Sequence, residues 1–407
     1  MDGTRMPGQE DGQGEYLRAG TREFLRARVS LFLAGFATFA TLYCVQPLMP
    51  AFAVEFAVSP AESSLALSLS TGTLAFSLLL AGALSDALGR KPVMFASLLA
   101  SGLLGLLAAV APDWPWLLVV RALEGVALSG LPAVAMAYVS EEVDPKAVGV
   151  TMGLYIGGTA LGGMSGRALT AAVADVADWR MAMAAVGLLG LVAAAALWFG
   201  LPASRRFVGR PPGLGELTAA WRAHLGDPGL RRLFALGFLT MGAFVTVYNY
   251  TGFRLTEAPF ELRPAVVGAV FLVYLAGVVA SPWFGGLAGR HGQRRVLLAA
   301  VALTLAGLML MEPPSLVAVV AGLTLFTAAF FGAHTIASGW IGQRARTARG
   351  QASALYLFSY YMGSTLAGYA GGLFWGAWGW LGVAGFVGLL LLAALAVAAR
   401  LPTRASG

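Results

Sequence analysis

The sequence contains little cysteine, little histidine and little charge. Of its 407 residues, one is a cysteine (Cys44), three are histidines, and 12% are charged, which is about half the share usual in soluble proteins. The single cysteine excludes an internal disulfide and a cysteine-based zinc site. The shortage of charge excludes a soluble enzyme and a disordered protein, and the sequence carries no phosphate loop, zinc motif or nucleotide fingerprint. We therefore expect no metal and no cofactor, while a membrane enzyme stays open.

Apolar residues, in contrast, make up 58% of the chain, and the mean hydropathy is +0.75. Soluble domains contain about 45–50% apolar residues, so lipid is the expected solvent. At about 20 apolar residues per span, the chain holds enough for about twelve spans. The sequence therefore predicts an all-α integral membrane protein, with apolar stretches at 29–51, 63–84, 92–111, 115–139, 147–172, 181–201, 231–253, 264–287, 295–311, 315–341, 351–375 and 379–399.

Lysine and arginine are distributed unequally over the predicted loops. If the N-terminus is cytoplasmic, 22 of the 27 basic residues fall on the cytoplasmic side, and the outer side holds only Arg180, Arg254 and Arg263. The positive-inside rule then predicts a multi-pass protein of the cytoplasmic (inner) membrane with both termini in the cytoplasm. This topology also explains the net charge of +7, so we expect the lipid bilayer, and no nucleic acid, as its surroundings.

The longest internal connection divides the predicted spans six and six. Residues 202–230 are rich in proline and glycine, and Leu214, Leu217, Trp221 and Leu225 fall on one helical face. We interpret this segment as a cytoplasmic linker with an amphipathic helix on the membrane surface, with a solvated linker as the alternative. The predicted organisation is then a cytoplasmic tail at 1–28, six-helix bundles at 29–201 and 231–400, and a cytoplasmic tail at 401–407. The N-terminal tail lacks the apolar run and cleavage site of a signal peptide.

The second half of the chain repeats features of the first half. A shift of about 205 residues places Tyr155, one leucine and three glycines of the fifth span onto Tyr360, one leucine and three glycines of the eleventh. A shift of 203 places the loop 82–91 onto the loop 285–294. Single glycine matches mean little in this composition, so the argument rests on the co-linear set. Parallel repeats of this kind indicate two bundles around a central solute path.

The loop after the second span carries the most specific motif, Gly82-Ala-Leu-Ser-Asp86-Ala-Leu-Gly89-Arg90-Lys91. It resembles the signature of the major facilitator superfamily, and the second copy is degenerate because Gly289 replaces the aspartate. The resemblance implies the major facilitator fold, with twelve transmembrane helices in two pseudo-symmetric six-helix bundles. It also implies a cytoplasmic gate, in which Asp86 and Arg90 pair with an acid at the end of span four. The gating residues are then Gly82, Asp86, Gly89, Arg90, Lys91 and Glu141.

Span five is rich in glycine from Gly153 to Gly166 and looks like the corresponding motif of the drug:proton antiporters. The proline of that motif is missing, because Gly163 follows Gly162. Over residues 29–400 the chain is most similar to the twelve-span drug-efflux and sugar-efflux branch of the superfamily. Closely spaced glycines also allow tight helix contacts, so packing remains an alternative explanation for this motif.

Three charged residues lie well inside predicted spans, where charge is costly and function is the default hypothesis. Arg121 and Glu124 are three residues apart on one helix face, with Glu124 about 14 Å deep. Burial favours the protonated carboxyl whereas Arg121 favours the carboxylate, as a reversible proton site requires. Glu124 and Arg121 are therefore candidates for proton coupling, against a permanent structural ion pair. Arg167 is a candidate solute contact, or it extends to the outer surface.

Further polar residues lie in spans that the family assigns to the solute cavity. His334 in span ten is a candidate proton relay or solute contact, against a packed hydrogen-bonding residue. The amphipathic side chains of spans one and seven are the main solute-contact candidates, against residues of the membrane-interface belt. Two tyrosines of span eleven are secondary candidates. The full set is Tyr43, Gln46, Tyr248, Asn249, Tyr250, Tyr360 and Tyr361.

These features predict a secondary transporter, not an enzyme. We expect a monomer that moves a small organic solute (drug-like compound, sugar or metabolite) by alternating access, in proton-coupled efflux. The alternatives are a passive facilitator or a proton-coupled importer of the same fold. A remote alternative is an intramembrane serine protease, because Gly163-Met-Ser165-Gly166 resembles a rhomboid motif and His334 would be the base.

Overall fold

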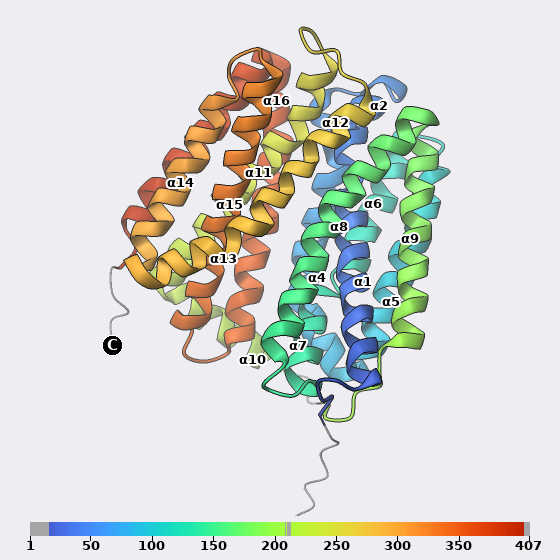
Figure 1. Ribbon diagram of the computed structural model, residues 1–407, viewed down its shortest axis with the longest axis vertical. Helices are drawn as coiled ribbons and strands as arrows, with labels where there is room; N and C mark the ends of the chain where they lie inside the picture. The colour runs from blue at the N-terminus through green and yellow to red at the C-terminus, as the bar shows by residue number, and fades with distance from the viewer. Residues whose placement is uncertain (1–15, 208, 210–212, 403–407) are drawn as a thin grey trace, which may run out of the picture.

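The computed structural model describes residues 16–207, 209 and 213–402, and these form two helical bundles that lie side by side (Figure 1). The first bundle contains α1 (Arg22–Tyr43), η1 (Gln46–Leu48), α2 (Met49–Glu55), α3 (Pro60–Ser63), α4 (Leu65–Leu88), α5 (Arg90–Ala109), α6 (Trp114–Leu128), α7 (Pro132–Glu142), α8 (Val148–Val176) and α9 (Trp179–Gly200). The second contains α11 (Pro228–Thr256), α12 (Pro264–Val270), η2 (Phe271–Val273), α13 (Tyr274–His291), α14 (Gln293–Leu310), α15 (Leu316–Arg344) and α16 (Arg349–Ala399).

A short helix, α10 (Leu214–Gly226), lies in the connection between the bundles. Leu217 is buried, and Trp221 Nε1 donates a hydrogen bond to Gln351 Oε1 at 2.8 Å. α10 therefore packs against the second bundle, although Leu225 on the same helix stays 48% exposed. We call the end of the molecule that carries α10 and the start of α1 the linker end, and the opposite end the distal end (Figure 1).

The helices account for the twelve apolar stretches of the sequence. Ten helical runs in the described part of the chain are long and apolar enough to cross a membrane. α8 is also long enough, at 29 residues, but glycine and Arg167 lower its hydropathy. α16 contains two spans, because its backbone leaves the helical region at Trp378 and Gly379. The rings of Phe374 and Phe386 stack with centroids 4.7 Å apart, whereas twelve residues of straight helix span about 18 Å, so the chain reverses there.

Aspartates begin several of the helices. Asp113 accepts a hydrogen bond from Trp116 N at the start of α6, and Asp178 accepts one from Met181 N at the start of α9, each at 2.8 Å. Asp227 accepts from Gly229 N and Leu230 N at the start of α11. The first turns of a helix have unpaired N–H groups, so these side chains supply the missing acceptors and define where each span begins.

Glycines allow α8 to lie directly on α1. A Cβ on Gly162 would lie 2.0 Å from Phe36 O, and one on Gly166 would lie 2.5 Å from Ala40 Cα. The second bundle repeats the arrangement, because a Cβ on Gly363 of α16 would lie 2.1 Å from Phe238 O of α11. Gly363 matches Gly158 of α8 in the repeat, and a Cβ on Gly158 would lie 2.6 Å from Phe32 O of α1. This pair of matching glycines thus occupies matching helix contacts, and the two bundles are pseudo-symmetric.

The two bundles contact each other in their distal parts. Thr71 Oγ1 of α4 lies 2.9 Å from Thr365 Oγ1 of α16, and Asp175 near the end of α8 forms an ion pair with Arg263 at 2.6 Å. A Cβ on Gly372 of α16 would lie 2.3 Å from Ala61 Cα of α3. In Figure 1 the ribbons of the two bundles accordingly approach at the top and diverge toward the linker end.

Candidate functional site

Arg121 and Glu124 of α6 form an ion pair inside the first bundle. Both side chains have no exposed area, and Arg121 Nη1 donates a hydrogen bond to Glu124 Oε2. The other carboxylate oxygen, Oε1, is buried and has no hydrogen-bond partner in the part of the chain that the structure describes. It lies beside the close contact of Gly105 on α5 with Gly187 on α9, 3.6 Å from the point where a Cβ on Gly105 would stand. Glu124 thus keeps one free acceptor in an otherwise apolar interior.

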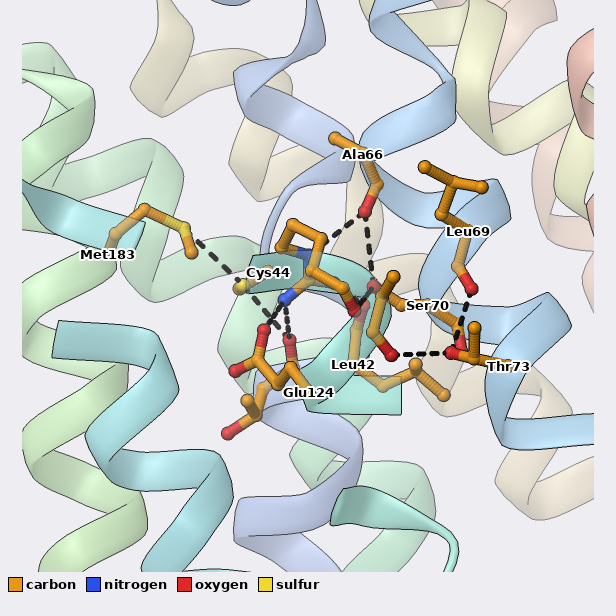
Figure 2. Close-up of polar contacts among 11 residues, drawn as sticks. Leu42, Cys44, Ala66, Leu69, Ser70, Thr73, Glu124 and Met183 are labelled. Atoms are coloured by element: carbon orange, nitrogen blue, oxygen red, sulfur yellow. Dashed lines mark hydrogen bonds and ion pairs between the residues drawn. The ribbon is translucent and has the colours of Figure 1, made fainter. Parts of the chain in front are cut away.

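The guanidinium of Arg121 also binds backbone carbonyls from two other helices, including those of Leu42 and Ala66, which Figure 2 labels near Glu124. It donates to Thr41 O at 3.3 Å and to Leu42 O at 2.9 Å, both at the end of α1, and to Ala66 O of α4 at 2.9 Å. Carbonyls at a helix end lack intrahelical partners, so Arg121 supplies the donors that the break after α1 requires. Ser70 Oγ returns a hydrogen bond to Arg121 O at 2.7 Å. Arg121 therefore connects the proton-site candidate to the end of α1.

Arg167 of α8 lies in a second buried group, between the bundles. Its exposed fraction is 0%. The alternative that Arg167 extends to the outer surface is therefore excluded. Its Nη1 donates to Gly163 O at 2.6 Å and its Nε donates to Gln46 Oε1. Its Cζ lies 4.4 Å from the ring centroid of Tyr43, 4.9 Å from that of Tyr274 and 5.4 Å from that of Tyr248.

Gln46 joins Arg167 to the second bundle. Gln46 Nε2 donates to Asn249 Oδ1 of α11 at 2.7 Å, and the neighbouring Tyr248 hydroxyl lies 2.7 Å from Thr327 Oγ1 of α15. We call the residues Tyr43, Gln46, Arg167, Tyr248, Asn249 and Tyr274 the arginine cluster. It brings together five of the sequence-predicted solute contacts and adds one that sequence reasoning missed. Tyr274 could have been found from the sequence, because it is a polar residue within the apolar stretch 264–287.

Tyr360 and Tyr361 continue from the arginine cluster along α16 toward the linker end. Their rings meet edge to face with centroids 5.3 Å apart, and Tyr360 contacts His334 with centroids 4.7 Å apart. His334 Nδ1 lies 2.9 Å from the Tyr356 hydroxyl. His334 and Tyr360 are only partly buried, whereas the arginine cluster is fully buried, so this aromatic path becomes more accessible away from Arg167.

Tyr250 lies apart from the other candidates. Its hydroxyl donates to Gly368 O at 2.8 Å, and its ring stacks on Trp375 at 6.0 Å, so the side chain packs between α11 and α16. The helical spacing explains the separation, since adjacent residues of a helix point in directions about 100° apart. Tyr248 faces Arg167, and Tyr250, two positions on, faces α16.

The predicted gating residues form an ion-pair network at the linker end. Arg90 Nη1 lies 2.6 Å from Asp86 Oδ1, and Arg90 Nη2 lies 2.6 Å from Glu141 Oε1. Lys91 Nζ donates to Leu201 O at 2.6 Å. Gly89 has φ +93°, which only glycine adopts without strain, so it permits the reversal from α4 to α5, while a Cβ on Gly82 would meet no atom within 4 Å. The network joins α4, α5 and α7 of one bundle.

The sequence of residues 31–271 matches the family model of the Major Facilitator Superfamily. This chain belongs to that superfamily. It is 48% identical to the inner membrane transport protein YnfM of Escherichia coli (strain K12) over 96% of this chain and 94% of the relative. It is 43% identical to the uncharacterised MFS-type transporter YybF of Bacillus subtilis (strain 168), over 93% of this chain and 94% of the relative.

A solved structure shares the transporter's fold. It is a bacterial homologue of the human lysosomal transporter Spinster in an inward-facing, unoccupied conformation, with a TM-score of 0.72 over 94% of this chain and 95% of that one. The sequences are 15% identical, so this likeness concerns the fold alone. Family, relatives and fold together make this chain a membrane transporter of a solute, with twelve transmembrane helices in two bundles.

Proposed function

We propose that this transporter exports a small organic solute across the inner membrane in exchange for protons, by alternating access. The observation that carries the proton coupling is Glu124, a fully buried carboxylate with one oxygen unpartnered and the other paired with Arg121. Such a carboxylate can hold a proton without losing a hydrogen bond at Oε1. The similarity of the glycine-rich α8 to the span-five motif of drug:proton antiporters supports export as the direction of solute transport.

The solute binds at the arginine cluster and the adjoining aromatic path through Tyr361, Tyr360 and His334. These residues come from both bundles, as alternating access requires, because a solute held between two bundles is exposed to one side when they rock. Tyrosine rings and amides in an otherwise apolar surrounding are typical of organic ligand sites. His334 contacts the solute from the linker end of this path.

A short backbone segment connects the proton site with the solute site. Arg121 binds the carbonyls of Thr41 and Leu42, while Tyr43 and Gln46 contact Arg167. Thr170 Oγ1 of α8 also donates to Cys44 O at 2.8 Å. Protonation of Glu124 changes the charge that Arg121 faces, and Arg121 holds the end of α1. We propose that this segment transmits the change to the solute site.

The linker end is the cytoplasmic side in this proposal. The basic residues of the chain concentrate there, which supports the orientation by the positive-inside rule. The distal bundle contacts then close the outer side, and the network of Asp86, Arg90 and Glu141 belongs to the cytoplasmic gate. The name of the relative YnfM, an inner membrane transport protein, supports the location.

The test uses purified protein in liposomes that contain a pH-sensitive dye. A panel of drugs, sugars and organic acids is added to the native protein, to Glu124→Gln and to Glu62→Gln. Glu62 is an exposed carboxylate at the N3 position of a capping box, where glutamine functions as well, so it is the matched control. We expect solute-linked proton movement in the native protein and in Glu62→Gln, and none in Glu124→Gln.

A passive facilitator is the second candidate, and one observation favours it. Arg121 binds three backbone carbonyls in addition to Glu124, as a permanent structural ion pair would. Solute uptake without proton movement, unchanged in Glu124→Gln, would contradict coupling and identify Glu124 as a structural partner of Arg121. We do not propose a serine protease. Treatment with a serine-reactive fluorophosphonate tests this, and we expect Ser165 to stay unlabelled.

A further inference from the structure

We infer that the solute is an organic anion whose negative group binds between Arg167 and Asn249. This inference rests on the proposed solute site and adds the chemical class of the solute. It starts from the charges of the first bundle's interior. Arg121 has Glu124 as its partner, whereas no ion pair of Arg167 occurs in the part of the chain that the structure describes. A buried charge without a counter-charge is costly, so the resting site lacks a negative partner.

Within the described residues, the hydrogen bonds and ring contacts of Arg167 are all with neutral groups. They are the carbonyl oxygen of Gly163, the amide oxygen of Gln46 and the three tyrosine rings of the arginine cluster. Tyr274 also interacts electrostatically with the guanidinium, but a neutral tyrosine leaves the positive charge in place. Nη2 of Arg167 is buried, and none of the described residues forms a hydrogen bond with it.

The hydrogen-bond directions in this cluster are determined by Arg167. Arginine can only donate, so Gln46 presents its oxygen to Arg167 and its NH₂ group to Asn249. Asn249 then accepts with Oδ1, and its own NH₂ group, Nδ2, is left buried without a partner. The unpartnered atoms at both ends of this chain, Arg167 Nη2 and Asn249 Nδ2, are therefore donors. An acceptor is what the site lacks.

A third unpartnered group, the hydroxyl of Ser68 on α4, lies near Asn249. Ser68 Oγ is buried and has no hydrogen-bond partner among the described residues. A Cβ on Gly368 of α16 would lie 3.4 Å from Ser68 Oγ and 3.2 Å from Asn249 Nδ2, so these two groups pack against the same glycine. Arg167, Asn249 and Ser68 come from α8, α11 and α4, which belong to both bundles. A carboxylate accepts several hydrogen bonds at once and satisfies donors of this kind.

The surroundings favour an organic anion over an inorganic one. Tyr43, Tyr248 and Tyr274 enclose the guanidinium, and Tyr361 and Tyr360 extend the aromatic lining toward the linker end. Aromatic faces suit an apolar or aromatic body attached to the acidic group. A cationic solute would meet Arg167 as a like charge. With the cytoplasm negative, the membrane potential also drives an anion outward, in the direction we propose.

The test compares acids with neutral and cationic molecules of the same shape. Benzoate, phenylacetate and cinnamate are titrated into purified protein in nanodiscs, beside their amides and the corresponding amines. Binding is measured by thermal shift and by equilibrium binding of the radiolabelled acids. We expect at least one acid to bind at least tenfold more tightly than its amide, and the amines and sodium phosphate not to compete.

Three variants locate the site. Arg167→Gln and Asn249→Asp should each lower the affinity for the acid at least tenfold, the first by removing the cation and the second by adding a negative charge. Asn249→Asp keeps the shape of the side chain, so it stays informative if Arg167→Gln does not fold. Arg180→Gln, at an exposed distal position, is the control and should bind normally.

Three results would overturn the inference: equal binding of acids and amides, unchanged affinity in both cluster variants, or full competition by phosphate. Transport in liposomes separates this inference from the proposed function. If neutral sugars or cationic drugs move and acids neither bind nor move, the anion inference fails while export stands. If acids bind but no solute of the panel moves, the site stands and the proposed export fails.

Discussion

At the scale of single residues, the glycines of α8 have two different surroundings. Gly162 lies against the backbone of α1, where an added Cβ would come within 2.0 Å of Phe36 O, whereas a Cβ on Gly157 would meet no atom within 4 Å. The sequence motif does not distinguish these positions, since both are glycines in one run. Their difference comes from α1, which lies more than a hundred residues earlier in the chain.

We predict that Gly162→Ala destabilises the protein and Gly157→Ala does not. Overpacking of this kind costs about 1–3 kcal/mol, because α1 and α8 must move apart, whereas alanine at an open helix position gains up to about 1 kcal/mol over glycine. Thermal unfolding in detergent measures both. Equal stability of the two variants would show that the close contact is not required. Lost transport in a stable Gly157→Ala would assign the motif a role beyond packing.

The candidate residues were predictable from the sequence to the extent that they are polar residues in apolar stretches. Arg121, Glu124 and Arg167 stand out in this way, and the spacing of the first two places them on one helix face. Their partners were not predictable, because Arg121 binds Thr41 and Leu42, about eighty positions away. Neither was the burial of Arg167, which depends on the approach of α11 and α13 from the other bundle.

At the scale of helices, the spans were predictable and their internal breaks were not. The apolar stretch 29–51 contains most of α1, all of η1 and the start of α2. The prolines of this region explain the break, together with Arg121, which binds the carbonyls that the break leaves free. The reversal inside α16 has a sequence signal in Gly379, whose φ of +57° suits glycine. The apolar pattern locates the spans, but it does not identify the hydrogen-bond donors that satisfy the free carbonyls where a helix ends.

The start of α11 depends on Asp227, and its stability contribution should vary with pH. Burial raises the pKa of Asp227, but hydrogen bonds from Arg344 and from the N–H groups of Leu230 and Gly229 outweigh this, so the pKa lies below its usual value. The carboxylate therefore stabilises the fold above the ordinary pKa of about 4, and this contribution is lost as the pH falls through the lowered pKa.

We predict that Asp227→Asn unfolds at a lower temperature than the native protein at pH 7, and that the difference is constant down to about pH 4 and shrinks below it. Asparagine keeps the capping oxygen but loses the ion pair with Arg344, which lies 2.8 Å from Asp227. Asp227→Ala should lose about 1 kcal/mol more, because the cap is lost as well. Unfolding is followed in detergent from pH 7 down to about pH 2, so that the scan passes through the lowered pKa. A difference that does not change with pH would contradict the ion-pair explanation.

At the scale of the whole molecule, the internal repeat predicts two bundles but not how they touch. Residues that match between the halves, such as Gly158 and Gly363, lie within each bundle and report its internal packing. Contacts between the bundles, such as Thr71 with Thr365, have no counterpart in that pattern. A transporter must also break these contacts in each cycle, so they depend on its conformation as well as on its sequence.

We predict that a disulfide between positions 71 and 365 stops transport. Thr71 and Thr365 approach to 2.9 Å across the distal contact of the bundles, and alternating access requires them to separate. The chain has one cysteine, Cys44, which is buried. The variant that combines Thr71→Cys, Thr365→Cys and Cys44→Ala therefore has the two new cysteines as its only thiols. Transport in liposomes should stop on oxidation and return on reduction, while each single cysteine variant stays active throughout. Undiminished transport by the cross-linked protein would mean that the solute passes without opening of the distal contact, which would overturn alternating access through this side.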